Sequence, residues 1–204
     1  MIKQMAFYFN ASACIGCKTC ELACKDKNNL PIGVRLRHVF EYGGGNWKKN
    51  DGYWIPNQIF TYFVSSSCMH CETPICVEVC PTGAMHKNEN GIVSVDKNKC
   101  IGCRLCQQAC PYGAPQFNDE KGVMAKCDLC MDLIDAGENP ACVSACPQRA
   151  LDFGELSELQ AKYGTVSGID PLPDPSLTHP SVVITPHRYS ALSGQGTGKI
   201  KVEV

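Results

Sequence analysis

Short apolar runs, separated by glycine, proline and polar turn residues, are the main pattern along this chain. Residues 6–9 and 59–64 are apolar and aromatic runs that each predict a β-strand. Residues 83–86 and 92–95, joined by the polar segment 87–91, predict a β-hairpin. All of these runs are far shorter than the roughly 20 apolar residues that a membrane-spanning helix needs. We therefore expect no direct membrane span, so any attachment to a membrane must go through a partner protein.

The remaining pattern is sparse in apolar residues. Segments 123–126 and 150–154 are strand-like, and a short helix is expected through Glu158, Leu159 and Lys162. Leu, Ile, Val and Phe together make up about 22% of the chain, just above the range typical of disordered proteins. The formal net charge of −1, from 19 basic and 20 acidic residues, gives no indication of nucleic-acid binding. So few apolar residues suggest that bound cofactors complete the core and that the chain without them is largely unfolded.

The chain contains 16 cysteines, and all of them fall into four groups of four. The groups are Cys14, Cys17, Cys20, Cys24; Cys68, Cys71, Cys76, Cys80; Cys100, Cys103, Cys106, Cys110; and Cys127, Cys130, Cys142, Cys146. Groups one and three have the spacing C-x2-C-x2-C-x3-C, whereas groups two and four have a longer middle gap. Pro81, Pro111 and Pro147 follow the last cysteine of groups two, three and four, and Lys25 takes this position in group one.

This spacing predicts four [4Fe–4S] clusters. The first three thiolates of a group can close around one cube of iron and sulfide. The fourth lies four residues beyond the third, so a helix would place both on one face and direct the last thiolate to a neighbouring cluster. Gly16 and Gly102 allow the backbone to approach the sulfur atoms closely. Four clusters in one chain predict a relay for single electrons.

Other uses of the cysteines fit less well. Four-cysteine zinc sites, as in a zinc-stabilised structural module, also use C-x2-C pairs but do not require the full spacing found here. A disulfide scaffold would imply secretion, yet residues 1–9 lack the apolar core of a secretory signal. His70 lies between Cys68 and Cys71, but no group lacks a cysteine, so His70 is not needed as a ligand. We find no catalytic constellation, and Gly43-Gly44-Gly45 is a weak signal for nucleotide binding because no helix pattern follows it.

The predicted fold class is α+β, with two nested ferredoxin-like βαββαβ units. Residues 1–25 with 119–160 would form the outer unit, and residues 58–118 the inner unit. Residues 26–57 would be a loop insertion, and residues 161–204 an extended tail. This nesting pairs group one with four and group two with three. The spacing also allows the rival pairing of one with two and three with four.

The insertion and the tail are the segments without cysteines. The insertion contains Trp47 and Trp54, and its length and aromatic content favour a contact surface for a partner subunit over a loop that covers the clusters. The tail is rich in proline from Pro171 onward and in glycine near its end, so we expect it to be disordered or to extend along a partner.

The cysteine motifs and their neighbours together resemble the iron–sulfur subunits of dimethyl sulfoxide reductases. The segments that carry this resemblance are 14–26, 41–44, 80–87, 110–116, 149–154, 171–173 and 184–186, so the resemblance covers essentially the whole chain. Related four-cluster subunits serve nitrate, formate and polysulfide enzymes. The nitrate type is longer and lacks one cysteine of group three, and the formate type usually carries a C-terminal membrane helix. All four cysteines of group three are present here, and no such helix is expected.

The resemblance implies how the cysteines are shared. The four sites, numbered by group, are Cys14, Cys17, Cys20 with Cys146; Cys68, Cys71, Cys76 with Cys110; Cys100, Cys103, Cys106 with Cys80; and Cys127, Cys130, Cys142 with Cys24. Their cofactors are four [4Fe–4S] clusters. The implied partners are a molybdopterin catalytic subunit and an integral membrane anchor that oxidises quinol.

The resemblance also implies a role and a location. The chain would relay electrons from quinol to a catalytic subunit that reduces dimethyl sulfoxide in anaerobic respiration. An equivalent subunit of a polysulfide, thiosulfate, tetrathionate, selenate or formate enzyme is the alternative. The protein would lie peripherally at the cytoplasmic membrane, on the periplasmic face after folded co-export with the catalytic subunit. The cytoplasmic face is the alternative location.

Overall fold

The structure is a computed structural model that describes residues 3–201. Its elements are β1 (Met5–Asn10), α1 (Thr19–Lys27), β2 (Arg37–Asn50), β3 (Tyr53–Ser67), α2 (Ile75–Glu78), β4 (Met85–Lys87), β5 (Val93–Val95), α3 (Leu105–Ala109), β6 (Gln116–Asn118), β7 (Val123–Ala125), α4 (Met131–Asp135), α5 (Ala141–Ser144), β8 (Leu151–Glu155), α6 (Leu156–Tyr163), the 3₁₀ helix η1 (Pro175–Leu177), β9 (Val182–Thr185) and β10 (Lys199–Ile200). Residues 1–2 of the expected outer unit and 202–204 of the expected tail lie outside the described residues. Small sheets and short helices confirm the coarse α+β class.

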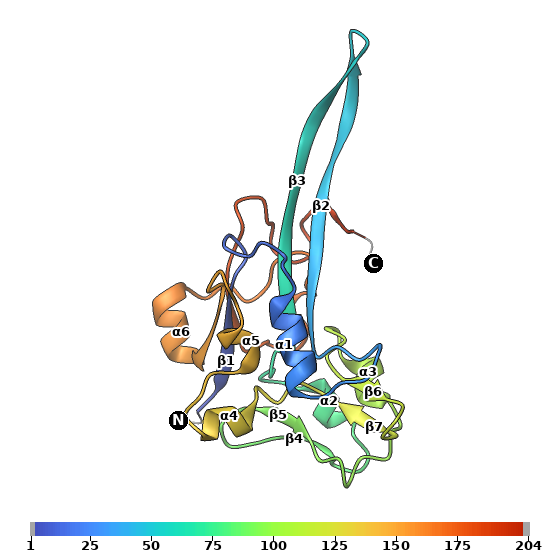
Figure 1. Ribbon diagram of the computed structural model, residues 1–204, viewed down its shortest axis with the longest axis vertical. Coiled ribbons are helices and arrows are strands. Elements are labelled where there is room, and N and C mark those ends of the chain that lie inside the picture. The colour runs from blue at the N-terminus through green and yellow to red at the C-terminus, as the bar shows by residue number, and fades with distance from the viewer. Residues whose placement is uncertain (1–2, 202–204) are drawn as a thin grey trace.

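The longest strands, β2 and β3, form a hairpin that projects far beyond the rest of the molecule (Figure 1). The expected loop insertion was therefore wrong in its secondary structure, because most of it is strand. The two strands are joined at Asp51-Gly52, both with positive φ angles of 48° and 89°. This dipeptide is a strong signal for a tight hairpin turn, because both residues tolerate the backbone that the turn requires. A β-bulge interrupts the register between Gly44 and Asn46.

A three-stranded sheet with the order β8-β1-β9 forms one side of the body. Strand β1 pairs antiparallel with β8 and parallel with β9, so that Phe7 lies opposite Phe153 and Phe9 opposite Ile184. Because side chains alternate along a strand, Phe7 and Phe9 enter the main core while Ala6 and Tyr8 face the other way. Strand β1 thus joins the end of the cysteine-rich region to the C-terminal tail.

The expected short helix is present as α6, which covers the second face of this sheet. Its Leu159 is 4% exposed and packs in one cluster with Ala6, Tyr8 and Val183. The rings of Tyr8 and Tyr163 stack with their centroids 3.6 Å apart. This layer is an apolar contact that contains no cysteine.

Two small hairpins, β4–β5 and β6–β7, form the other end of the body. The first one confirms the hairpin expected between residues 83 and 95. Short helices connect the hairpins with the cysteine segments: α1 packs on α5, and α2 packs on α3. These contacts join segments that lie far apart in the sequence.

The C-terminal segment corrects a further expectation, because the described part of the tail packs on its own chain. Strand β9 extends the sheet of β1, and β10 pairs with β2 at the base of the hairpin. The carboxylate of Asp170 accepts hydrogen bonds from the backbone of Gly194 and Gly196, and its carbonyl accepts one from Tyr62 Oη at 2.6 Å. The free edges of β1 and β2 supply backbone partners that local sequence patterns do not reveal.

Candidate metal centres

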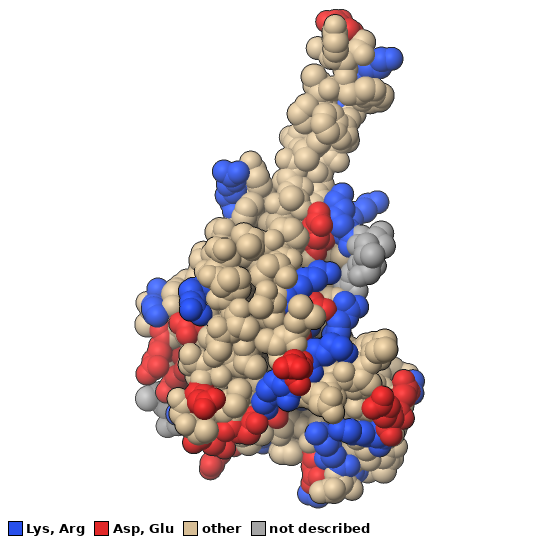
Figure 2. Space-filling model, in the orientation of Figure 1, with Lys and Arg blue, Asp and Glu red and all other residues tan. Residues whose placement is uncertain are grey.

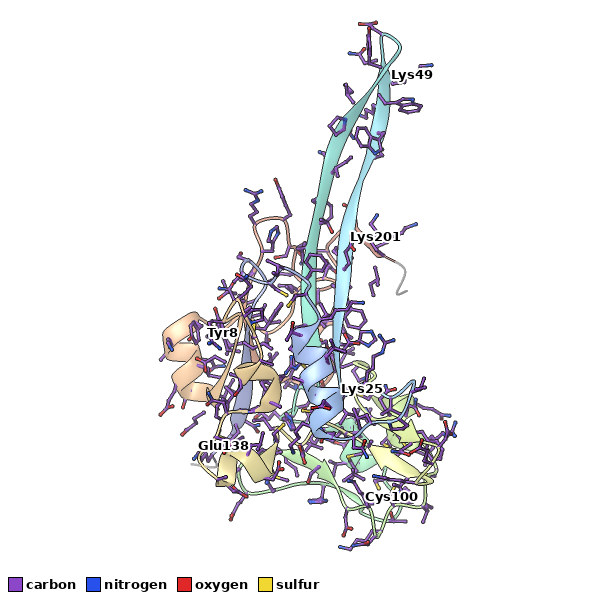
Figure 3. All side chains as sticks on the ribbon, viewed as in Figure 1. Tyr8, Lys25, Lys49, Cys100, Glu138 and Lys201 are labelled. Carbon is purple, nitrogen blue, oxygen red and sulfur yellow. The ribbon has the colours of Figure 1, made fainter. Side chains whose placement is uncertain are left out.

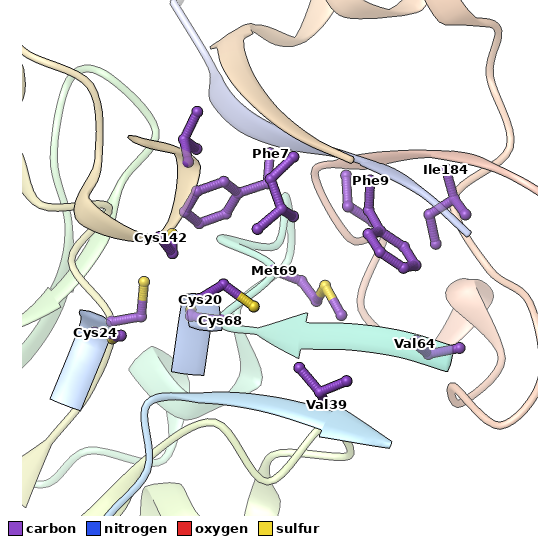
Figure 4. Close-up of a cluster of buried hydrophobic side chains, with 14 of the residues drawn as sticks. Phe7, Phe9, Cys20, Cys24, Val39, Val64, Cys68, Met69, Cys142 and Ile184 are labelled. Carbon is purple, nitrogen blue, oxygen red and sulfur yellow. The ribbon is translucent and has the colours of Figure 1, made fainter. Parts of the chain in front are cut away.

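Cysteine side chains form much of the core of this protein. All 16 are free thiols within the described residues, and nine of them are buried. Cys20 and Cys24 lie on α1, Cys76 on α2 and Cys142 on α5, all on short helices. Figure 4 shows Cys20, Cys24, Cys68 and Cys142 in one packed region with Phe7 and Met69. The sulfur atoms thus take the place that branched apolar residues occupy in other small proteins.

The first and third groups share the same backbone geometry. Lys18 and Arg104, which follow the second cysteine of each group, have left-handed φ angles of 59° and 62° and precede helices α1 and α3. Gly16 and Gly102 also have positive φ, at 70° and 68°, where a Cβ would lie 2.4 Å from Phe63 and from the Gly122 carbonyl. Side chains other than glycine rarely adopt this backbone, so its recurrence indicates a loop shaped around one kind of ligand.

The second and fourth groups share another geometry. His70 and Leu129, each directly before the second cysteine, have φ angles of 45° and 63°. Pro74 and Pro140 each precede a four-residue helix that carries the third cysteine of the group. The 11-residue gap of group four holds the additional helix α4. These matching geometries relate group one to three and group two to four.

Backbone N–H groups point at several sulfur atoms. Met85 N donates to Cys80 Sγ at 3.4 Å, and Ala150 N donates to Cys146 Sγ at 3.3 Å. Met124 N donates to Cys100 Sγ at 3.4 Å. Such bonds stabilise thiolate over thiol and tune a metal cluster bound to it.

Two small cavities are lined by cysteines from different groups. Cys14, Cys17, Cys20 and Cys146 line the first, together with apolar residues such as Phe9 and Val39. Cys80, Cys100, Cys103 and Cys106 line the second, together with Met85 and Met124. Each cavity therefore combines three thiols of one group with the last thiol of another. These combinations are the residues expected for sites 1 and 3.

The remaining eight cysteines interact electrostatically in two further sets. Burial raises the pKa of Cys24 to about 12; Arg37 opposes this shift, and Cys142 and Cys130 add to it. Burial also raises the pKa of Cys76 to about 12, with contributions from Cys68, Cys110 and Cys71. Cys24 thus interacts with thiols of group four, and Cys110 interacts with Cys76 of group two. Such thiols ionise at neutral pH when a metal replaces the proton.

The donor sets suit iron–sulfur clusters. Within residues 3–201, no three His, Cys, Asp or Glu side chains converge closely enough to hold a single metal ion. In the two cavities the thiols instead surround an apolar space, as a cube with iron atoms at alternate corners and one thiolate for each iron requires. The residues present therefore fit four cubane clusters.

Two buried cations beside the cysteines were not identified from the sequence as part of the sites. Arg37 is 2% exposed and Lys126 is 5% exposed. Although burial opposes ionisation of Cys68, its neighbours His70 and Lys126 lower its pKa to about 5. His70 is fully buried, and its Nδ1 accepts a hydrogen bond from Val93 N. This bond fixes the His70 ring beside Cys68. The sequence feature that could have indicated Lys126 is its position directly before Cys127, the first cysteine of group four.

Comparisons with known proteins identify the same type of cofactor. Two family profiles, both described as 4Fe-4S dicluster domain, match residues 59–156 and 13–84. The B subunit of polysulfide reductase from Wolinella succinogenes is 38% identical over 197 residues, which cover 94% of this chain and 99% of the relative. The thiosulfate reductase electron transfer subunit of Salmonella typhi is 42% identical over 160 residues, covering 78% and 79%. The B subunit of anaerobic dimethyl sulfoxide reductase from Escherichia coli (strain K12) is 51% identical over 198 residues, covering 97% and 96%.

The protein belongs to the family of dimethyl sulfoxide reductase iron–sulfur subunits. It is a non-catalytic electron-transfer subunit, and its cofactors are four [4Fe–4S] clusters. Each bound cluster accepts and donates one electron at a time. Family membership also argues against a zinc-stabilised structural module.

Two features describe the surface of this iron–sulfur subunit. Cys17 of group one and Cys103 of group three are exposed, whereas all cysteines of group four are buried. No helix among the described residues is long and apolar enough to cross a membrane. Groups one and three therefore each reach the surface through one thiol.

Proposed function

We propose that this chain relays single electrons through its four clusters, from a quinol-oxidising membrane anchor to a molybdopterin catalytic subunit. The observation that carries the proposal is the set of four sulfur sites, two of which reach the surface through Cys17 and Cys103. Exposed end sites allow electrons to enter and leave, and buried sites between them exclude solvent. The anchor and the catalytic subunit follow from the relatives, which are single subunits of larger reductases.

The proposed ligand sets follow the nested pairing. Site 1 joins Cys146 to group one, site 4 joins Cys24 to group four, and sites 2 and 3 exchange Cys110 and Cys80. Two packed helix pairs support this, since α1 contacts α5 and α2 contacts α3. Pairing of the first and last strands, β1 with β8, supports an outer ferredoxin-like unit built from both ends of this region. The nested units are residues 1–25 with 119–160 around 58–118.

The contacts between sites support the order 1, 4, 2, 3 for the relay. Cys20 of site 1 interacts with Cys142 of site 4, and Cys127 of site 4 interacts with Cys68 of site 2. Cys76 of site 2 and Cys106 of site 3 pack in one apolar cluster. Sites 1 and 3 then lie at the two ends.

Single-cysteine variants test the ligand sets. Cys103→Ala and Cys80→Ala should alter the same low-temperature EPR signal, because both residues belong to site 3. Cys76→Ala is the matched control, since it lies in the same segment as Cys80 but should alter the signal of site 2. If Cys80→Ala and Cys76→Ala alter one signal and Cys103→Ala another, the nested pairing is wrong. Variants that retain iron are compared, and iron content is measured for each.

The outer part of the β2–β3 hairpin, residues 44–60, is called the arm, and we propose that it binds the catalytic subunit. Trp47, Tyr53 and Trp54 on the arm are 59%, 77% and 64% exposed. Charged residues are sparse between its base and its tip, whereas they are dense over the body (Figure 2). Lys49 lies near the far end of the arm, and Cys100 lies at the opposite end of the molecule (Figure 3). Exposed aromatic residues with few charges are typical of protein interfaces.

The proposed location is peripheral, at the cytoplasmic membrane, through the anchor subunit. We place the chain on the periplasmic face, because clusters are inserted before export and a folded complex can be exported on a partner's signal. Protease treatment of intact spheroplasts tests this: degradation of the chain supports the outer face, and protection places it on the cytoplasmic face.

Activity measurements test the role in the complex. Deleting this subunit should abolish quinol-linked reduction of dimethyl sulfoxide by membranes, while the catalytic subunit retains activity with an artificial dye donor. Quinol-linked activity that survives the deletion would contradict the relay. Dimethyl sulfoxide is the proposed terminal substrate because of the 51% identical relative. Polysulfide and thiosulfate, named for the more distant relatives, are assayed in parallel as alternatives.

A further inference from the structure

Two cations are buried between the cluster sites, where a positive charge is costly unless an anion compensates it. Arg37, at the start of β2, is 2% exposed, and Lys126, directly after β7, is 5% exposed. None of the hydrogen bonds or ion pairs of either side chain within the described part of the chain goes to a carboxylate. Their counter-charges must come from elsewhere.

Arg37 is held in a fixed orientation next to sites 1 and 4. Its two terminal nitrogens donate to Ser65 Oγ and Ser67 Oγ, each at 3.0 Å, and its guanidinium lies 4.6 Å from the centre of the Phe7 ring. Ser65 Oγ lies 3.5 Å from Cys20 Sγ, so the serine accepts from Arg37 and keeps its own proton for the sulfur. The Nε of Arg37 is buried and has no hydrogen-bond partner in the described chain.

The neighbours of Arg37 are the ligands of two sites. Phe7, whose ring faces the Arg37 guanidinium, packs in one buried cluster with Cys20, Cys24, Cys127 and Cys142. Cys20 belongs to site 1, and the other three belong to site 4. A guanidinium keeps its charge at any ordinary pH, so Arg37 places a fixed positive charge at the junction of these two sites.

Lys126 lies at the next junction. Its Nζ donates a hydrogen bond to the sulfur of Cys68, a ligand of site 2, at 3.4 Å. It also donates to the backbone carbonyl of Cys127 at 2.6 Å and to that of Val93. The thiol of Cys127 is a ligand of site 4. One ammonium group thus bonds to residues of two sites at once.

We propose that Arg37 and Lys126 are positioning residues that place one positive charge at each end of site 4 and thereby favour the reduced clusters at sites 1, 4 and 2. This inference rests on the proposed relay. In each transfer one electron leaves a reduced cluster, which is oxidised, and enters its neighbour, which is reduced, and no bond or proton is exchanged. A nearby cation stabilises the form with one more negative charge, and charge and hydrogen bonds to sulfur are what set cluster potentials. The two charges therefore keep the buried middle of the relay reducible.

The test is an EPR-monitored redox titration of membranes that contain the assembled complex. Arg37→Gln and Lys126→Gln should each disfavour reduction of two clusters by at least tenfold, a fall of about 59 mV for a one-electron couple. One affected signal should be common to both variants, because site 4 faces both cations. Arg37→Lys and Lys126→Arg keep the charge and should stay within that limit. Lys162→Gln removes an exposed charge from α6 and should leave all potentials unchanged.

The outcomes are decisive in each direction. Unchanged potentials in glutamine variants with full iron content, or no signal common to both, would overturn the inference. If a glutamine variant loses its clusters, the inference stands only if the charge-conserving variant of that position retains iron and potentials. Loss of iron in the charge-conserving variants as well would mean that shape, not charge, matters there. The titration does not use substrate turnover, so failure of the proposed substrate or partners would leave it unaffected.

Discussion

Single residues in this protein serve either the clusters or the packing around them. Leu159 is an example of the second kind, because it is 4% exposed in the layer between α6 and the sheet and lies away from the cysteines. Ala6 and Val183, both 0% exposed, complete this layer. The two roles can therefore be separated by mutation.

Leu159→Ala should lower stability without removing iron. A large-to-small change in a packed layer costs about 2–5 kcal/mol of unfolding free energy, because a cavity remains. We expect the anaerobic thermal midpoint to fall by several degrees while the iron content stays that of wild type. Leu177→Ala, at a position that is 62% exposed, is the matched control and should change neither quantity. Loss of iron in Leu159→Ala would mean that this layer is coupled to the sites.

At the scale of elements, the tail shows how much one short strand contributes. Strand β9 buries Val182, Val183 and Ile184, which are at most 6% exposed. Complete burial of three such side chains contributes roughly 4–9 kcal/mol. This is a large part of the roughly 5–15 kcal/mol by which a typical protein is stable. Strand β10, in contrast, is exposed.

Two truncations compare these strands. A chain that ends after residue 180 lacks β9 and β10 and should fail to accumulate with iron. Strand β1 then loses its neighbour β9, and the main core loses Val182 and Ile184. A chain that ends after residue 190 retains β9 but lacks β10 and the hydrogen bonds of Gly194 and Gly196 to Asp170; it should keep its clusters. Iron content and the visible absorption of anaerobically purified protein measure both. Full iron content in both truncations would show that β9 is dispensable.

The arm can be shortened without touching the cluster sites. Replacing residues 46–57 with Asn-Gly, which forms a tight two-residue turn, retains the base of the hairpin. We expect full iron content but at least a tenfold loss of affinity for the catalytic subunit, measured by co-purification at graded concentrations. The double variant Trp47→Ala/Trp54→Ala should weaken binding in the same direction. Unchanged binding by both variants would assign the arm another role.

At the scale of the whole molecule, the clusters and the fold depend on each other. Nine buried cysteines contribute to a core that has few branched apolar residues. Without metal, these positions would be partly ionisable thiols packed against one another. Binding free energy at such sites is also folding free energy.

Removing iron should therefore unfold most of the body. Anaerobic chelation is expected to abolish amide-exchange protection in α1, α5 and β1 and to release about sixteen iron atoms, four for each of four clusters. Amide hydrogen exchange and iron analysis before and after chelation measure this. Full protection that persists in the iron-free chain would contradict the coupling, and zinc in place of iron would contradict the cluster assignment.

The sequence by itself determined the cofactor and most local elements of this protein. Cysteine spacing specified the cluster type, since ligand number and interval are local chemical requirements. The strands around Phe7, Phe60 and Val93 and the helix at Leu159 followed from apolar runs. Asp51-Gly52 also carried a readable hairpin signal, which the sequence interpretation had missed. In each of these cases the determining contacts lie within a few residues along the chain.

The tertiary structure decided what depends on distant partners. The parallel pairing of β9 with β1 and the contact of β10 with β2 join residues more than 150 positions apart, so no local pattern predicts them. The cysteine spacing left open whether Cys146 combines with group one. In the structure, Cys146 lines one cavity together with three cysteines of that group. Arg37 and Lys126 are ordinary charged residues in the sequence. Only packing removes them from water and surrounds them with sulfur, because burial is a property of the whole fold.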